Sequence, residues 1–105
     1  MYQKLIKNPF WKIKDFDNTF ISNFAYPIIT KNLDTLVKDL RKNEVEIRPL
    51  ICGSIGQQPF WKNKYGEASF PFADIVHDYG LYLPNNPDLT EIQIEFISNI
   101  VNRNI

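Results

Sequence analysis

Two stretches decide the fold: residues 20–29, which read FISNFAYPII, and residues 45–51, which read VEIRPLI. The first is dense in aromatic and β-branched side chains and the second alternates apolar with polar residues, so both predict strands. Pro27 places the first strand at a sheet edge or a bulge, because proline cannot donate a hydrogen bond to a ladder. A short helical crossover between two strands favours either parallel pairing or a split arrangement, and the pattern leaves both open.

The helix between these strands is predicted by apolar residues that recur at i, i+3, i+4 and i+7, the spacing of one helical face. Thr30 or Asn32 offers a cap for its first turn. The other face is polar, so the helix lies with one side on the rest of the domain. The apolar residues are Leu33, Leu36, Val37 and Leu40.

The second half of the chain predicts a helix over residues 70–79, with Pro71 at an early position and Gly80 as the terminating residue. Residues 81–83 predict a short strand. Together with the first two strands, this gives an α+β fold in two layers, a small three-stranded sheet with helices packed on it.

The last helix begins at Thr90, with Gln93 three residues on as its capping-box partner. At the other end of the chain, residues 1–8 are compatible with a helix that Pro9 stops, and residues 10–18 read as a surface connector. The predicted buried stripe of the last helix comprises Ile92, Phe96, Ile97, Ile100 and Val101.

Length and charge exclude several classes of function. The 105 residues allow one domain, and twelve basic side chains balance twelve acidic ones, which argues against sequence-independent nucleic-acid binding. There is no apolar run of about 20 residues, no secretory leader pattern, no Gly-rich phosphate loop and no Cys/His set with metal spacing. With Cys52 as the single cysteine, we expect a cytoplasmic protein without a membrane partner, an internal disulfide or a metal site.

Residues 52–69, CGSIGQQPFWKNKYGEAS, hold three of the four glycines and predict a long loop. Its polar residues Ser54, Gln57 and Gln58 suit hydrogen bonds to hydroxyl groups such as those of a sugar, although a flexible surface loop fits the same composition. Aromatic rings at Phe60, Trp61 and Tyr65 could stack on a ligand or seal an interface, and the simpler expectation is that they anchor the loop to the core.

Two further candidates carry chemistry. Cys52 and His77 could form a nucleophile–base pair if Asp74 or Asp78 oriented the imidazole, but packing of the thiol as a small hydrophobe is the stronger expectation. The Arg48 guanidinium could hold a phosphate or carboxylate in bidentate fashion; by residue type alone, solvent exposure or pairing with Glu46 or Asp74 is favoured.

Three stretches in order resemble the C-terminal small domain of the DegT-type sugar-nucleotide aminotransferases and the related 4-keto-6-deoxysugar 3-dehydratases. They are NFAYPIIT at 23–30, VEIRPLICGSIGQQPFW at 45–61 and FPFADIVHDYGLYLPNNPDLT at 70–90. The Arg-Pro strand with the following Gly and Gln-Pro is most similar to the dehydratase branch. The resemblance covers about two thirds of the chain.

The resemblance implies one part of a fold-type I enzyme that uses pyridoxal or pyridoxamine phosphate, acts as a dimer on nucleotide-linked keto sugars and serves deoxysugar or lipopolysaccharide biosynthesis. Residues 1–19 would be a connector and the end of an interdomain helix, and residues 20–105 a single small domain. The cofactor pocket and its Schiff-base lysine, or the histidine that replaces it in dehydratases, would belong to a large domain. We therefore expect no cofactor site and no catalytic residue in this chain, and no activity from it alone.

By the same resemblance, Arg48 would be an anion contact, and Ser54, Gln57 and Gln58 would face hydroxyl groups of the substrate or the neighbouring subunit. Family members often have Asn where this chain has Ser54, which puts that contact in doubt.

A second hypothesis is a free-standing binding or oligomerisation module that keeps the small-domain fold. The face that packs on the large domain would then be covered by self-association. Its candidate residues are Phe16, Phe20 and the Phe60–Trp61 pair.

Overall fold

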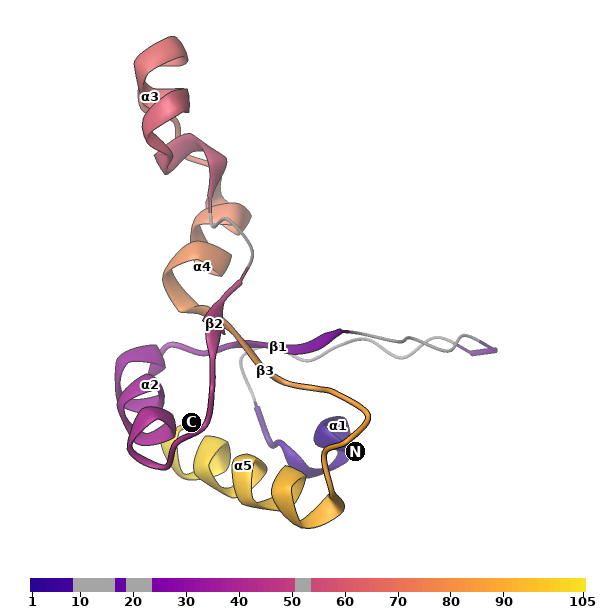
Figure 1. Cartoon of the computed structure of the whole chain (residues 1–105). Coiled ribbons are helices and arrows are strands. Elements are labelled where there is room, and N and C mark those ends of the chain that lie inside the picture. The colour runs from indigo at the N-terminus through magenta and orange to yellow at the C-terminus, as the bar shows by residue number, and fades with distance from the viewer. Residues whose placement is uncertain (9–16, 19–23, 51–53) are drawn as a thin grey trace.

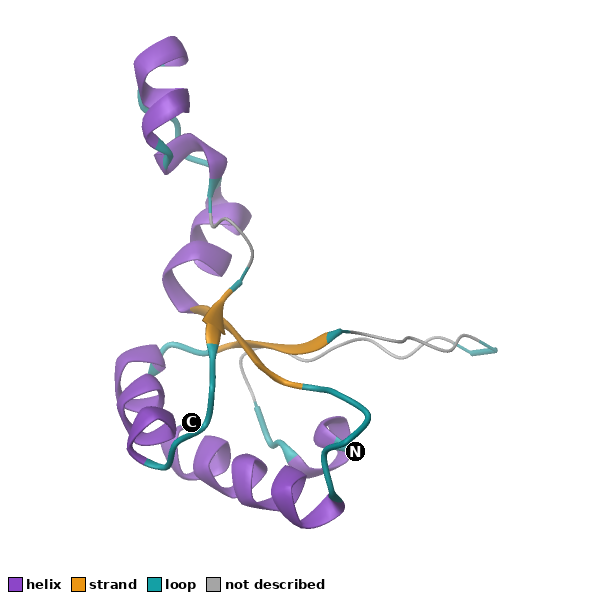
Figure 2. Ribbon diagram, viewed as in Figure 1, coloured by secondary structure: helices purple, strands orange, loops and turns teal. Residues whose placement is uncertain are grey.

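A computed structural model of the chain describes residues 1–8, 17–18, 24–50 and 54–105. Within these residues the fold is α+β as predicted, with a small antiparallel sheet between helices (Figures 1 and 2). The elements in chain order are α1 (Tyr2–Leu5), β1 (Ala25–Ile29), α2 (Leu33–Lys42), β2 (Arg48–Pro49), the 3-10 helix η1 (Ile55–Gln57), α3 (Pro59–Tyr65), α4 (Pro71–Tyr79), β3 (Gly80–Pro84) and α5 (Glu91–Asn104).

The strand order is β1-β3-β2, and β3 pairs antiparallel with both neighbours. β1 and β2 are therefore separated by β3, which is the split arrangement and not the parallel pairing that the sequence also allowed. Tyr82 lies opposite Pro27 on one side and opposite Arg48 on the other. Because β1 is an edge strand, Pro27 stands where its missing N–H does least harm, as predicted.

Strand β2 is shorter than the predicted 45–51, since the ladder covers only Arg48 and Pro49. Val45 and Ile47 nevertheless pack partly buried against the core, while Glu46 between them is exposed. The alternation of apolar and polar residues thus predicts correctly which side chains of residues 45–47 are buried, although these residues lie outside the strand ladder. Cys52 and the end of the predicted strand lie outside the described residues.

The core lies between the sheet and the helices α1, α2 and α5. The Lys7 backbone N–H donates to Asn102 Oδ1 and the Asn102 amide donates to the Leu5 carbonyl, both at 2.8 Å, so the first residues are fastened to α5. The predicted boundary between residues 19 and 20 stays a prediction. The buried apolar cluster comprises Tyr2, Ile6, Tyr26, Ile28, Leu36, Leu40, Leu81, Leu83, Ile97, Ile100 and Val101.

The capping box of α5 is confirmed: the Gln93 N–H donates to Thr90 Oγ1 at 3.2 Å, and the Thr90 N–H donates to Gln93 Oε1 at 2.9 Å. The predicted stripe is only partly right. Ile97 is buried as expected, but Ile92 is 78% exposed and Phe96 is 48% exposed. At 3.6 residues per turn Ile92 lies roughly 140° around the helix from Ile97, so one core-facing side cannot include both.

Residues 54–79 form an arm that projects from the sheet and contains η1, α3 and α4 (Figure 1). The prediction of helix α4 is confirmed, whereas the prediction of a loop over 52–69 is wrong for its described part. Pro59 occupies the first turn of α3, where its missing N–H is harmless, and Gly66 ends the helix with a φ of +78°.

Candidate functional site

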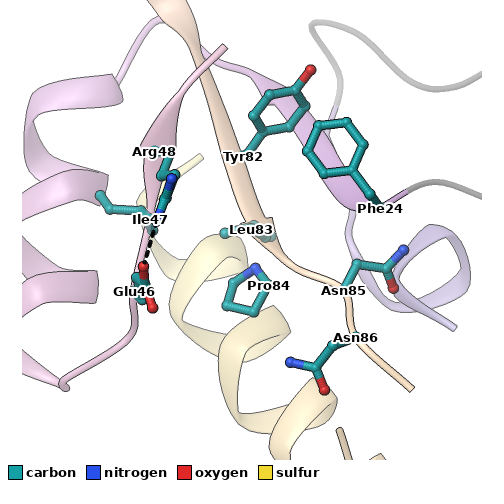
Figure 3. Close-up of a pocket in the computed structure, with 9 residues that line it drawn as sticks. All are labelled: Phe24, Glu46, Ile47, Arg48, Tyr82, Leu83, Pro84, Asn85 and Asn86. Carbon is teal, nitrogen blue, oxygen red and sulfur yellow. Dashed lines mark hydrogen bonds and ion pairs between the residues drawn. The ribbon is translucent and has the colours of Figure 1, made fainter. Parts of the chain in front are cut away.

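A surface pocket of about 210 Å³ lies beside the sheet, between β2 and the end of β3 (Figure 3). We call it the Arg48 pocket. Its lining residues are Phe24, Glu46, Ile47, Arg48, Tyr82, Leu83, Pro84, Asn85 and Asn86.

Strand pairing builds this pocket from distant parts of the sequence. β3 places Tyr82 opposite Arg48, and the start of β1 brings Phe24 beside Tyr82, with ring centroids 5.4 Å apart and planes tilted by 58°. In the view of Figure 3, Leu83 and Pro84 follow Tyr82 along β3, with Arg48 on one side of the strand and Phe24 on the other. The pocket therefore combines an apolar base and two rings with a cation at its margin.

The Arg48 side chain is 78% exposed, and its Nη2 lies 3.3 Å from Glu46 Oε1. The expected alternative of pairing with Glu46 is therefore observed. Such an exposed ion pair contributes about 0–1 kcal/mol at most, because water screens both charges. An incoming anion can replace Glu46 at little cost, so the pair leaves Arg48 available to a ligand.

Asp74 is the hydrogen-bonding centre of the arm. Its Oδ1 accepts from the Gln57 amide at 2.9 Å, and its Oδ2 accepts from the Ser69 hydroxyl at 3.0 Å and the Phe70 N–H at 3.2 Å. The approach of the Ser54 hydroxyl, followed by the Gln57 amide, lowers the pKa of Asp74 below its usual value. The carboxylate ties η1 to the first turn of α4.

Ser54 is fully buried where η1 begins, and its backbone N–H donates to His77 Nδ1 at 3.2 Å. Its carbonyl accepts from the Gln58 amide at 3.4 Å. Its hydroxyl makes no hydrogen bond of acceptable geometry to the described residues, although it approaches Asp74 closely enough to favour the ionised carboxylate. The Cys52–His77 hypothesis cannot be placed, because Cys52 lies outside the described residues.

The four predicted site residues thus fall into two groups. Ser54, Gln57 and Gln58 come together inside the arm, and Arg48 lies in a pocket that includes none of them. Sequence reasoning missed the Phe24–Tyr82 pair of that pocket. One local signal existed: on a strand with Leu81 and Leu83 facing the core, Tyr82 must point to the other side.

The aromatic residues of α3 do not anchor a loop to the main core. Trp61 packs on Tyr65 with ring centroids 4.6 Å apart and edge-on against Phe70 at 6.1 Å, all within the arm. Phe60 is 61% exposed. The other two surface candidates, Phe16 and Phe20, lie outside the described residues.

Two other kinds of site find no support in the described part of the chain. No three described His, Cys, Asp or Glu residues lie in a group that could hold a metal ion. None of the described helices has the length and apolar character needed to cross a membrane.

Comparison with protein families gives one match over nearly the whole chain. The model of the DegT/DnrJ/EryC1/StrS aminotransferase family matches residues 3–102. A comparison with curated proteins gave no match.

Proposed function

Because the chain belongs to the DegT/DnrJ/EryC1/StrS aminotransferase family, we propose that it is the C-terminal domain or a C-terminal fragment of a sugar-nucleotide aminotransferase or dehydratase. The family depends on pyridoxal phosphate and acts on sugars. In this proposal the chain helps to close over the substrate and contributes dimer contacts, but is not catalytic alone. The substrate of the whole enzyme would be a nucleotide-linked keto sugar, and the enzyme would be located in the cytoplasm.

The described residues do not fit the cofactor. A lysine that forms a Schiff base at neutral pH needs a desolvated pocket that lowers its pKa, but every described lysine side chain is exposed and none lines the Arg48 pocket. We therefore assign the cofactor and the chemistry to a large domain. The described lysines are Lys4, Lys7, Lys31, Lys38, Lys42, Lys62 and Lys64.

The observation that supports a substrate contact is the Arg48 pocket. A guanidinium beside apolar and aromatic surface suits a ligand that joins a phosphate to a flat ring, because Arg binds phosphate oxygens in pairs and rings stack on aromatic faces. A nucleotide-linked sugar has both features. Ser54, Gln57 and Gln58 remain proposed hydroxyl contacts. The Gln57 and Gln58 amides would have to exchange their present partners within the arm for the ligand, and the buried Ser54 hydroxyl would have to become accessible.

The test is a calorimetric or NMR titration of the whole chain with dTDP-glucose and UDP-glucose, with free glucose as the uncharged comparison. Arg48→Gln should weaken nucleotide-sugar binding about tenfold or more, the loss expected for a hydrogen bond to a charged group. Arg41→Gln, on the exposed face of α2, is the matched control and should bind as the wild type does. Equal affinity of wild type and Arg48→Gln would contradict the assignment of the pocket.

The second candidate, a free-standing binding or oligomerisation module, is favoured by one observation. The arm exposes large apolar side chains, among them Phe72, which is 84% exposed. The two candidates differ in the titration above, because only the first needs affinity for a nucleotide sugar.

A further inference from the structure

We propose that a second surface pocket, between the turn that follows α2 and the first turns of α5, binds an arginine side chain from a peptide segment of a partner protein. The pocket has a volume of about 230 Å³, and we call it the Phe96 pocket. This inference goes beyond the proposed function, because it does not involve a nucleotide sugar. The lining residues are Asn43, Glu44, Val45, Glu46, Pro84, Leu89, Gln93, Phe96 and Ile97.

The apolar part of the Phe96 pocket offers a flat ring beside aliphatic side chains. Phe96 is 48% exposed, and the aliphatic side chains that line the pocket with it are Val45, Leu89 and Ile97. Ile92 is 78% exposed and lies four residues before Phe96, so these two side chains are neighbours on the surface of α5. An exposed apolar strip therefore adjoins the pocket, and it suits the aliphatic stem of an arginine and an apolar residue next to it.

The polar groups of the pocket are mainly hydrogen-bond acceptors. The Asn43 amide nitrogen donates to the Asp39 carbonyl at 2.8 Å and to the Asp39 carboxylate at 3.0 Å, whereas the Asn43 side-chain oxygen accepts from no described residue. Glu44 and Glu46 add two carboxylates, and none of the described lining residues is a lysine or an arginine. Glu46 pairs with Arg48, but Glu44 forms no ion pair with a described residue. The uncompensated charge at the pocket is therefore negative, and the complementary ligand is a cation.

A guanidinium suits these groups better than a compact ammonium does. In the proposed complex its plane lies on the Phe96 ring, and its N–H groups donate to the Glu44 carboxylate and the Asn43 oxygen. Gln93 supplies a donor, because its Oε1 accepts from the Thr90 N–H at 2.9 Å and its amide nitrogen donates to no described residue. Acceptors for a guanidinium and a donor for a peptide carbonyl favour an arginine within a peptide over a free amine.

The backbone conformation of Glu44 supports a role for its side chain. The turn after α2 is a Schellman motif, because the Glu44 N–H donates to the Arg41 carbonyl and the Val45 N–H donates to the Leu40 carbonyl, both at 3.0 Å. This motif needs one residue in the left-handed region, usually glycine, and here Glu44 has a φ of +60°. A glutamate is less stable than a glycine in this conformation, and a binding role for the carboxylate gives a reason for its presence.

The first test is an NMR titration of the isotope-labelled whole chain with the peptide acetyl-Ala-Leu-Arg-Leu-Ala-amide. The control peptide has citrulline in place of arginine, which keeps the shape of the side chain but removes its charge. We expect a Kd of about 0.1–1 mM for the arginine peptide, and about threefold or weaker binding of the citrulline peptide. The largest signal shifts should occur at residues that line the Phe96 pocket. Equal affinity for the two peptides, or no binding of the arginine peptide at about 5 mM, overturns the proposal.

The second test removes the carboxylate. Glu44→Gln should weaken binding of the arginine peptide about threefold or more and should leave binding of the citrulline peptide unchanged. Glu67→Gln is the matched control, because Glu67 is also exposed but lies outside the pocket, and it should bind as the wild type does. Wild-type affinity in Glu44→Gln, or equal weakening by Glu67→Gln, contradicts the assignment of Glu44.

Glu44→Gly separates binding from folding. Glycine is favoured in the left-handed region, so this variant should unfold at a higher Tm than the wild type while it loses the preference for arginine over citrulline. A lower Tm together with weaker binding would instead assign Glu44 a structural role and overturn the proposal.

Discussion

Replacing two isoleucines of α5 by alanine tests the structure against the simple reading of helical periodicity. The sequence places Ile92 and Ile100 in one buried stripe, whereas the structure leaves Ile100 1% exposed within the core cluster and Ile92 78% exposed. The same substitution at two positions of one helix should therefore have very different effects on the free energy of unfolding.

The expected magnitudes follow from burial. Ile100→Ala removes the equivalent of three buried methylene groups, about 2.4 kcal/mol of transfer free energy, and leaves a cavity that brings the expected loss to about 3.5 kcal/mol. For 105 residues this loss corresponds to a fall in Tm of roughly 15 °C. Ile92→Ala loses about 0.5 kcal/mol of burial and recovers about as much from the higher helix propensity of alanine.

The assay is urea unfolding followed by circular dichroism, at one fixed chain concentration so that association does not differ between variants. The two variants should differ by about 3 kcal/mol at an unchanged m value. Equal destabilisation by both would show that α5 packs with the stripe read from the sequence and would refute the burial described above. A loss below about 1 kcal/mol for Ile100→Ala would refute its place in the core.

Two further predictions concern pH. Hydrogen bonds from Arg103, then Asn104, lower the pKa of Asp39 from 3.8 to about 2, so the stabilisation by its carboxylate is complete above pH 3.8 and is lost as the pH falls toward 2. In urea unfolding between about pH 4 and pH 2, the free energy of unfolding of Asp39→Asn should fall less steeply than that of the wild type. Equal slopes for the two proteins would contradict this prediction. Burial raises the pKa of Tyr2 to about 12, so the native state loses stability as the pH rises from 10 toward 12. The Tyr2 hydroxyl forms no hydrogen bond with a described residue. Tyr2→Phe should therefore remove the loss at high pH and raise the free energy of unfolding at neutral pH by about 1 kcal/mol. A lower free energy of unfolding in this variant would show that the hydroxyl has a hydrogen-bond partner.

Local signals made most of the helices predictable. The apolar spacing of α2 and the Thr90–Gln93 pair of α5 act within one or two turns, so neighbouring residues suffice to specify them. The same kind of signal was present in α3, because proline is common in the first turn of a helix and glycine just after its last turn. Pro59 and Gly66 occupy these two positions. The glycines and glutamines around this segment favoured the loop interpretation instead.

The strand order and the Arg48 pocket could not be derived in this way. Phe24 and Tyr82 are 58 residues apart in the sequence, and they meet only because β3 inserts between β1 and β2. That insertion depends on the combined burial of many side chains. Nothing in the residues around Arg48 specifies it.

Gln57 shows a different limit of sequence reasoning. A carboxamide that suits a sugar hydroxyl is equally suited to a carboxylate, and Asp74 supplies one at 2.9 Å. The choice between an internal and an external partner depends on what the fold brings within reach. A glutamine at position 57 therefore predicted a hydrogen-bonding side chain, but it did not predict whether the partner would be a ligand or Asp74.

The arm and the Arg48 pocket meet at one junction. α4 runs directly into β3 at Gly80, and the Tyr79 carbonyl accepts a hydrogen bond from the Thr30 N–H at 2.9 Å, so the base of the arm is fixed to the sheet. A Cβ at Gly80 would lie 2.5 Å from the Val76 carbonyl oxygen, which leaves no room for another residue at this turn. Tyr82 of the pocket follows two residues later on the same strand. One continuous segment of the chain therefore joins the arm to the pocket, through Gly80 and strand β3.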